Sequence, residues 1–191
     1  MDMLLPAMNS NRRAAADVIG YSEGTITSPL TRCAGFDVLV TGVDGPSVFT
    51  DFSRHPFERR APIVVNSHGL ASTASGKFQI LLRFWLASAR AHKYLDFSPY
   101  WQTMYVLQAW RERNALDLID AGRFEDFIAA INGLWASLPG KVYIGQNQRP
   151  MAWLMQKYHD AGGRLTFATD DTGGGTGPLP LISPSQFGPL P

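Results

Sequence analysis

Hydrophobic residues recur along most of the chain at the three- and four-residue spacing of helices with one apolar face. In the first of these segments the face is formed by Ala15, Val18 and Ile19, and Gly24 follows as a helix-ending residue. In the third, Ser98 and Pro99 form a typical helix start. The pattern predicts helices over residues 11–22, from about 76 to 89, and over 98–120, 124–135 and 150–161.

The spacing changes to strict alternation between Phe36 and Phe52, which is typical of strands with one buried face. Residues 41–46 interrupt the alternation with the turn formers Gly42, Asp44, Gly45 and Pro46. We therefore predict a β-hairpin over residues 36–52. The segment 53–70, which contains two prolines, is predicted to be an irregular loop.

This order of elements predicts an α+β fold, with a mainly helical lobe, a small antiparallel hairpin lobe and a cleft between them. The last residues differ in composition, because residues 170–191 contain five glycines and five prolines, and their only charges are Asp170 and Asp171. We expect an N-terminal extension over residues 1–12, a folded domain over 13–165 and a flexible Gly/Pro-rich tail over 166–191.

Composition excludes several classes of protein. The 191 residues carry 17 Lys and Arg against 16 Asp and Glu, a net charge of +1, which argues against a basic nucleic-acid-binding surface. A single cysteine excludes an intramolecular disulfide. No apolar run is long enough for a transmembrane helix, and the N-terminus lacks an ordinary signal peptide, so we expect no membrane insertion and synthesis in the cytosol.

The usual catalytic motifs are also missing. The sequence has no Gly-x-Ser-x-Gly, no His-Glu-x-x-His and no phosphate-binding loop with its lysine. The four histidines, at positions 55, 68, 92 and 159, are not paired on one helix face, so no metal site is predicted. Cys33 has no neighbouring base in the sequence and is interpreted as a small buried residue.

Glu23 is the most informative carboxylate, because it lies in the last turn of the first predicted helix, just before the hairpin. The partial negative charge at a helix C-terminus disfavours a carboxylate anion there. Shielding from water by nearby aromatic rings would raise the pKa further. Both effects favour a protonated carboxyl facing the cleft, which is what a general acid for glycosidic-bond cleavage requires.

Glycosidases usually need a second carboxylate. Asp37, Asp44 and Asp51 are the candidates on or near the hairpin, and none of them stands in a diagnostic motif. Asp44 precedes Gly45 and is most simply a turn residue. The residues therefore indicate one acid more clearly than a pair.

Six segments, in the same order and at similar spacing, resemble the lambda-type phage endolysins, which are lysozyme-like lytic transglycosylases. The resemblance extends from about Arg13 to Gly163. The segments are Tyr21-Ser-Glu-Gly-Thr25, Gly35-Phe-Asp-Val-Leu-Val-Thr-Gly42, Phe49-Thr-Asp-Phe-Ser-Arg-His-Pro56, Ser72-Thr-Ala-Ser-Gly-Lys-Phe-Gln79, Asp96-Phe-Ser-Pro99 and Trp135-Ala-Ser-Leu-Pro-Gly140.

The resemblance implies a lysozyme-like fold and cleavage of the β-1,4 bond between N-acetylmuramic acid and N-acetylglucosamine in peptidoglycan. It implies that Glu23 is the single catalytic acid and base, that the product carries a 1,6-anhydromuramic end, and that no cofactor or metal is used. Ser72, Thr73 and Gln79 match a segment beside the active site of the family. Tyr143 and Gln146 match a loop at the edge of its cleft, although Ile144 is inserted between the tyrosine and the glycine.

Two other interpretations remain at this point. The protein could be a hydrolytic muramidase that uses Glu23 with Asp37 or Asp51, or a non-catalytic virion component that binds glycan. On the favoured interpretation its partner is the glycan strand, and the protein is a monomer that lyses the host cell. Without an export signal it would accumulate in the host cytoplasm and reach the periplasm through a separate holin-type pore.

Overall fold

The computed structural model describes residues 4–140 and 148–166, and the predicted tail over 166–191 lies almost wholly outside this range. The helices are α1 (Ser10–Ser22), α2 (Leu82–His92), α3 (Pro99–Glu112), α4 (Leu116–Asp120), α5 (Phe124–Ile131) and α6 (Met151–Asp160), with a 3-10 turn at Pro56–Glu58. Two short strands, β1 (Ile63–Val64) and β2 (Ala71–Ser72), pair antiparallel. None of the helices in these ranges is long and apolar enough to cross a membrane.

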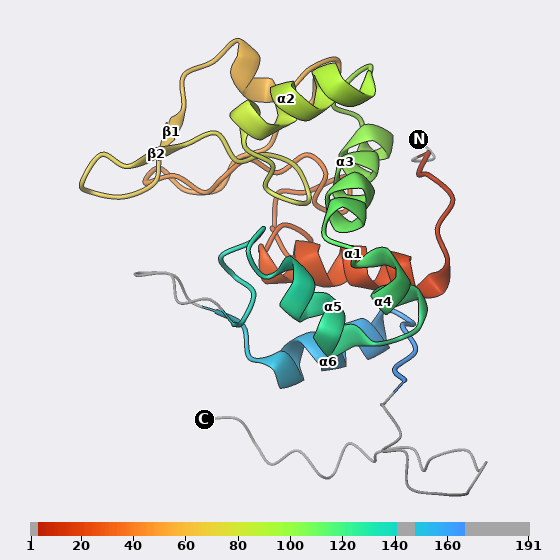
Figure 1. Ribbon diagram of the computed structural model, residues 1–191. Helices are drawn as coiled ribbons and strands as arrows, with labels where there is room; N and C mark the ends of the chain where they lie inside the picture. Colours follow the sequence, from red (N-terminus) through yellow and green to blue (C-terminus); the bar gives the residue numbers. More distant parts are fainter. Residues whose placement is uncertain (1–3, 141–147, 167–191) are drawn as a thin grey trace, which may run out of the picture.

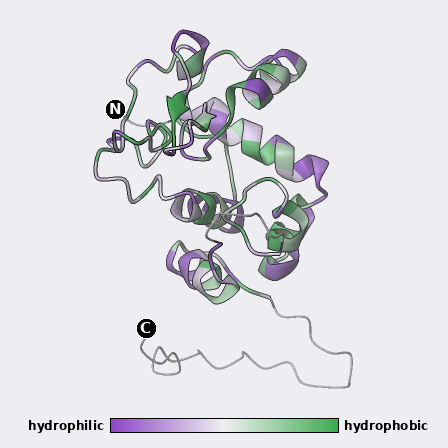
Figure 2. Cartoon of the chain, turned by 90° about the vertical axis from the view of Figure 1, so that its left-hand side faces the viewer, coloured by the Kyte–Doolittle hydropathy of each residue, from purple (hydrophilic) through white to green (hydrophobic). Residues whose placement is uncertain are grey.

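The fold is α+β, as the sequence predicts. α1 lies between two groups of elements: α2, α3 and the β1–β2 hairpin on one side, and α4, α5 and α6 on the other (Figure 1). α1 contacts both α6 and α4. Coloured by hydropathy, the helices carry both hydrophilic and hydrophobic residues along their length, as expected for helices with one buried face (Figure 2).

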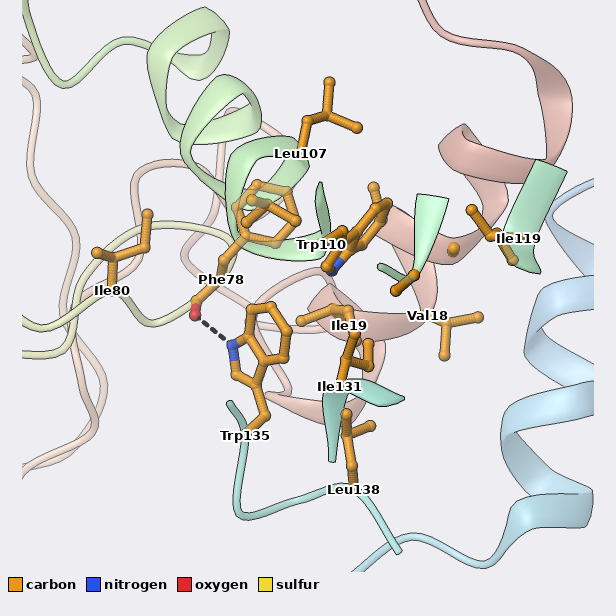
Figure 3. Close-up of a cluster of buried hydrophobic side chains, with 14 of the residues drawn as sticks. Val18, Ile19, Phe78, Ile80, Leu107, Trp110, Ile119, Ile131, Trp135 and Leu138 are labelled. Carbon is orange, nitrogen blue, oxygen red and sulfur yellow. Dashed lines mark hydrogen bonds between the residues drawn. The ribbon is translucent and has the colours of Figure 1, made fainter. Parts of the chain in front are cut away.

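The core continues from one lobe into the other around α1. Ile19 lies beside Trp110 of α3 and Ile131 of α5, and Trp135 closes the cluster from the segment after α5 (Figure 3). Each of these four side chains is buried. Because α1 contributes to the cores of both lobes, its C-terminal end is held at their junction.

Residues 36–52 form the two arms of the predicted hairpin, but they do not form regular strands. Their pairing is limited to the isolated bridges Val38–Val48 and Gly42–Gly45. The first arm also pairs on its other side, since the Val40 amide donates to the Ala74 carbonyl (3.0 Å) and the Gly76 amide to the Val38 carbonyl (2.7 Å).

The regular hairpin lies instead at residues 63–72, partly inside the segment predicted as an irregular loop, and this part of the prediction is wrong. Asn66 closes the hairpin, because its side-chain oxygen accepts hydrogen bonds from the amides of His68 and Leu70, both at 3.0 Å. Asn66 and Gly69 between Val65 and Leu70 are ordinary turn formers, so this signal was present in the sequence.

Three predicted helix boundaries also need correction. α2 begins at Leu82 rather than near Gly76, because Ser75 and Ile80 exchange backbone hydrogen bonds and close a tight turn. The helix predicted over 98–120 is two helices, α3 and α4, separated at Asn114, whose φ of 53° is left-handed. α5 ends at Ile131, so Trp135 lies in the following turns.

The N-terminal boundary is also informative. α1 starts at Ser10, and Asn11 donates to the Ile119 carbonyl (3.1 Å) and accepts from the Arg164 amide (2.8 Å). Arg12 forms a salt bridge with Asp120, which lowers the pKa of that carboxyl. Residues 10–12 of the predicted extension are therefore packed against α4 and the end of the domain.

Gln102 of α3 joins three segments that line or support the junction between the lobes. Its side chain is fully buried. Its Oε1 accepts from the Lys77 amide (3.1 Å), and its Nε2 donates to the carbonyls of Phe36 (3.0 Å) and Phe97 (2.9 Å). The close approach of Gln102 also requires a glycine at position 76, because an added Cβ would lie 2.0 Å from Gln102 Oε1. The φ of Gly76, +75°, favours glycine as well.

We predict that Gln102→Leu lowers the free energy of unfolding by about 3 kcal/mol or more, because it leaves three backbone groups buried without partners. Gln108→Leu, on the same helix, is the matched control, since Gln108 bonds only to exposed groups of Glu112 and Arg111. Urea denaturation followed by circular dichroism measures both. Equal, small losses of stability in the two variants would contradict this role of Gln102.

Candidate active site

Glu23 is the residue that ends α1, and the chain turns sharply after it. The Glu23 amide donates to the Ile19 carbonyl (2.9 Å) and completes the helix. Gly24 then has a φ of +72°, which favours glycine, and the Thr25 amide returns to the Gly20 carbonyl (3.0 Å). The Thr25 hydroxyl donates to the Lys77 carbonyl at 2.7 Å. These bonds fix Glu23 between the end of α1 and the 75–80 turn.

A cavity of about 490 Å³ adjoins Glu23. One wall continues from Glu23 along residues 24–29, and another is formed by residues 38–41 of the first hairpin arm. Gln79 closes the cavity from the 75–80 turn. Among the described residues that line it, Glu23 is the only one with a titratable side chain. The lining residues are Glu23, Gly24, Thr25, Thr27, Ser28, Pro29, Val38, Leu39, Val40, Thr41, Pro46 and Gln79.

Burial raises the pKa of Glu23 above its ordinary value, in the direction expected from the sequence. One interaction opposes this: Ser137 Oγ donates a hydrogen bond of 2.6 Å to Glu23 Oε1, which favours the anion and lowers the pKa. The effect of burial is the larger, so the net shift of the pKa is upward. A carboxyl in this state retains its proton to higher pH than an exposed glutamic acid does.

Ser137 is a site residue that the sequence analysis did not single out. It lies 114 positions from Glu23 and reaches it through the segment after α5. The indole nitrogen of Trp135 donates to the Phe78 carbonyl (2.8 Å), as Figure 3 shows, and the Arg149 amide donates to the Ser137 carbonyl (2.9 Å). Ser137 stands in one of the matching segments, but nothing in its spacing from Glu23 indicates the contact.

Gln79 lies on the cavity wall with an unusual backbone conformation. Its φ is +48°, a left-handed value that costs a non-glycine residue free energy. Its side-chain Nε2 donates to the Gly76 carbonyl at 3.0 Å. Strain of this kind is typical of functional sites, where the surrounding structure holds a side chain in place.

Ser72 and Thr73 make local hydrogen bonds and are absent from the cavity lining. Ser72 Oγ accepts from the Ala74 amide (3.2 Å), and Thr73 Oγ1 accepts from the Leu82 amide (3.1 Å) at the start of α2. Tyr143 and Gln146, the other two predicted binding residues, lie outside the described residues.

None of the three aspartates considered as a second carboxylate lines this cavity. Asp37 is buried and accepts hydrogen bonds from the Thr31 hydroxyl (2.5 Å) and the Arg32 amide (2.9 Å), so it organises its own loop. Asp44 lies in the turn closed by the Gly42–Gly45 bridge. Hydrogen bonds from the side chain of Ser53 and from its amide (2.9 Å) lower the pKa of Asp51.

His55 is a buried residue of the 53–58 loop, and its ring nitrogens hold backbone groups. Its Nε2 lies 3.0 Å from the Ile80 carbonyl, and its Nδ1 accepts from the Phe57 amide (3.3 Å). Burial lowers the pKa of this histidine. In the described ranges, no three His, Cys, Asp or Glu side chains are grouped so that they could hold a metal ion.

Comparison with known proteins places this geometry in a family. The family model described as Endolysin matches residues 13–165. The endolysin of Escherichia phage P2 is 44% identical over 163 residues, which cover 83% of this chain and 98% of that protein. The endolysin of Escherichia phage lambda is 39% identical over 159 residues, which cover 83% of this chain and 95% of that protein.

Two solved structures of bacteriophage lambda lysozyme match the fold. One is a complex with a chitohexasaccharide, with a TM-score of 0.76 and 37% identity, and the other is described as lysozyme from bacteriophage lambda, with a TM-score of 0.72 and 36% identity. Each match covers 85% of this chain and all of the lambda chain. The fold and its cleft are those of a lysozyme-like enzyme, and the chain belongs to the endolysin family.

The raised pKa of Glu23 has a consequence for stability. A carboxyl whose pKa is higher in the folded state than in the unfolded state destabilises the fold as it ionises, beginning above the unfolded value of about 4.3. We predict that Glu23→Gln is more stable than the unmodified protein at pH 7–8, by about 1 kcal/mol, the usual scale for relief of a strained functional site.

The advantage should shrink as the pH falls towards 4, where both states of the unmodified protein hold the proton. Thermal unfolding of the two proteins between pH 4 and 8 measures the difference. The stability of Glu23→Gln relative to the unmodified protein could instead be lower at pH 8 than at pH 4. That result would show that ionisation of the buried Glu23 carboxyl does not destabilise the fold.

Proposed function

We propose that this endolysin cleaves the β-1,4 bond between N-acetylmuramic acid and N-acetylglucosamine in peptidoglycan by lytic transglycosylation, with Glu23 as the single acid and base. The observation that supports this most directly is Glu23 itself: a carboxyl with a raised pKa, and the only titratable side chain among the described residues of its cavity. The lambda lysozyme complex, whose ligand is a chitohexasaccharide, supports a glycan as the occupant of the cleft.

In the first step, Glu23 gives its proton to the bridging oxygen as the bond from that oxygen to the muramic C1 breaks. An oxocarbenium-like centre develops at C1, and the N-acetyl oxygen of the same sugar can stabilise it. In the second step, the C6 hydroxyl of the muramic residue attacks C1 and passes its proton to the Glu23 carboxylate. The balance is complete, because one C–O bond breaks, another forms and Glu23 ends protonated, with no water consumed.

An intramolecular hydroxyl makes a second protein carboxylate unnecessary, because its effective concentration at C1 is high. The hydrolytic muramidase considered from the sequence would use a second carboxylate, either as a base that activates water on the opposite face of the sugar or as a nucleophile. Asp37 and Asp51 are engaged in their own loops and lie outside the cavity lining, which favours the transglycosylase over the hydrolase.

Mass spectrometry of muropeptides released from purified peptidoglycan distinguishes the two reactions. We expect muramic ends that lack one water relative to a reducing end. Glu23→Gln should reduce product formation at least a hundredfold, the scale for loss of a general acid, while the exposed Asp51→Asn should leave product and rate unchanged. Reducing ends would establish a hydrolase, and full activity in Glu23→Gln would exclude Glu23 from the mechanism.

We further propose that Gln79 binds an acetamido group of the glycan, because an amide side chain can both donate to and accept from such a group. Its left-handed backbone would then be the cost of aiming it into the cavity. Ser72 and Thr73 would contribute to binding indirectly, because their hydrogen bonds hold the backbone before this turn and at the start of α2. Tyr143 and Gln146 remain proposed binding residues at the edge of the cleft.

Gln79→Gly tests this assignment, because glycine adopts a φ of +48° without strain. We predict an unchanged or slightly higher melting temperature together with a loss of about tenfold in kcat/KM, mainly through KM. The readouts are thermal unfolding and the turbidity of permeabilised Gram-negative cells. Activity equal to that of the unmodified protein would mean that Gln79 makes no contact with substrate.

On this proposal the protein acts in the periplasm, on the cell wall, after release from the host cytoplasm. Such release would depend on a separate holin-type pore. Its partners would be glycan strands alone, and the reaction needs no cofactor or metal.

A further inference from the structure

We propose that Ser137 and Ser22 form a hydroxyl pair that follows the protonation state of Glu23, in which Ser137 turns its hydrogen toward the carboxylate when Glu23 is ionised and toward Ser22 when Glu23 is protonated. This makes Ser137 and Ser22 positioning residues for the reaction. The inference rests on the proposed role of Glu23 as acid and base.

The geometry gives the Ser137 hydroxyl two acceptors but only one hydrogen. Ser137 Oγ lies 2.6 Å from Glu23 Oε1 and 3.1 Å from Ser22 Oγ. Ser22 Oγ itself donates to the Ile19 carbonyl at 3.0 Å, inside the last turn of α1. Because the Ser22 hydrogen is already used, Ser22 can only accept from Ser137, and it therefore competes with Glu23 for the same hydrogen.

The competition has a different outcome in the two states of Glu23. An ionised carboxylate is the stronger acceptor, since hydrogen bonds to charged groups are shorter and stronger than neutral ones. A protonated carboxyl is a weaker acceptor, and the Ser137 hydrogen can then turn to Ser22. That rotation frees the Ser137 oxygen to accept the Glu23 O–H. Only the hydroxyl hydrogen moves, and no oxygen has to change its position.

This arrangement suits a group that must be an acid in one step and a base in the next. Before transfer, the bridging oxygen of the substrate competes with Ser137 for the Glu23 proton. After transfer, the Ser137 hydrogen returns to the new carboxylate and stabilises charge that did not exist in the ground state. Interactions that form only as charge develops are the ones that accelerate a reaction.

The charged groups that face this site from the packed elements are engaged elsewhere. Lys77, in the turn beside α1, forms a salt bridge with Asp17 at 2.5 Å. On the side of α6, Lys157 lies over the Tyr21 ring and Arg149 lies over the Trp153 ring. The shift in the pKa of Glu23 arises from burial and from the Ser137 bond, with no charged group among its causes. Among the described residues, the Ser137–Ser22 hydroxyl pair is therefore the hydrogen-bonding group through which a substitution can change the pKa of Glu23.

The test uses two substitutions with opposite predicted effects. Ser137→Ala removes the donor to the anion, so the pKa of Glu23 should rise and the alkaline limb of the pH–rate profile should move to higher pH. The maximal rate of Ser137→Ala should fall about tenfold, because the Glu23 carboxylate that develops in the reaction loses its hydrogen bond. Ser22→Ala removes the competing acceptor, so the pKa and the alkaline limb should move to lower pH, with little change in the maximal rate.

Two further variants serve as controls. Ser137→Thr keeps the hydroxyl and should restore the profile, whereas a role in packing alone would not distinguish threonine from alanine in this way. Ser53→Ala, an exposed serine on the 53–58 loop, should leave the profile unchanged. Thermal unfolding of each variant establishes that it is folded at the temperature of the assay.

Carbon-13 NMR titration of the glutamate side-chain carboxyls, with Glu23 assigned by its loss in Glu23→Gln, gives the pKa directly and without turnover. Shifts in opposite directions for Ser137→Ala and Ser22→Ala support the hydroxyl pair. Shifts in the same direction, or no shift in either variant, overturn it. Full lytic activity of Glu23→Gln would instead overturn the proposed function, and the NMR titration would still decide the behaviour of the pair.

Discussion

The junction between the lobes depends on one buried amide. Gln102 holds the backbone of Phe36, Lys77 and Phe97 with three hydrogen bonds. The Lys77 carbonyl in turn accepts a hydrogen bond from the Thr25 hydroxyl, which holds the turn at Gly24 and Thr25 after α1. A chain of hydrogen bonds therefore runs from the core of α3 to the end of α1. Since buried polar groups are costly when unpaired, the elements around the cleft have little freedom to move independently.

This rigidity allows the protein to keep a destabilising group in place. A buried carboxyl with a raised pKa favours unfolding at neutral pH, and the left-handed backbone of Gln79 adds strain at another residue that lines the same cavity. Both features belong to residues that line the cavity. The surrounding core, in which Ile19, Trp110 and Ile131 pack together across the two lobes, supplies the stability that they oppose (Figure 3).

The sequence predicts those parts of the fold that follow from local periodicity. α1 and α6 agree with the predicted spans within one residue, and Gly24 has the left-handed conformation expected of a residue that ends a helix. The prediction of the strands is incomplete where one segment pairs with two others that lie far apart in the sequence. Residues 38–40 pair with both the second hairpin arm and residues 74–76, and the alternation of side chains contains no information about the second partner.

The site shows the same limit. Glu23 can be singled out as a candidate from its place at a helix end together with the family resemblance of its segment, and the direction of its pKa shift follows from burial. Ser137 could not be identified in this way, because its contact with Glu23 depends on the path of the chain after α5 and on the bond between Trp135 and Phe78. Short-range patterns indicate Glu23 as a candidate acid, whereas tertiary contacts determine which side chains lie beside its carboxyl.

The composition of the cavity constrains the reaction more strongly than the identity of Glu23 alone. In an inverting hydrolase, water attacks from the far side of the sugar ring and needs a carboxylate base there, at a separation that leaves room for it. The described residues that line the cavity offer hydroxyls, the Gln79 amide, backbone and apolar side chains, but no second carboxylate. On the proposed mechanism, a hydroxyl carried by the substrate itself needs no such base, because the Glu23 carboxylate formed in the first step takes its proton. One acid with an adjustable hydrogen-bond partner is then sufficient for both steps.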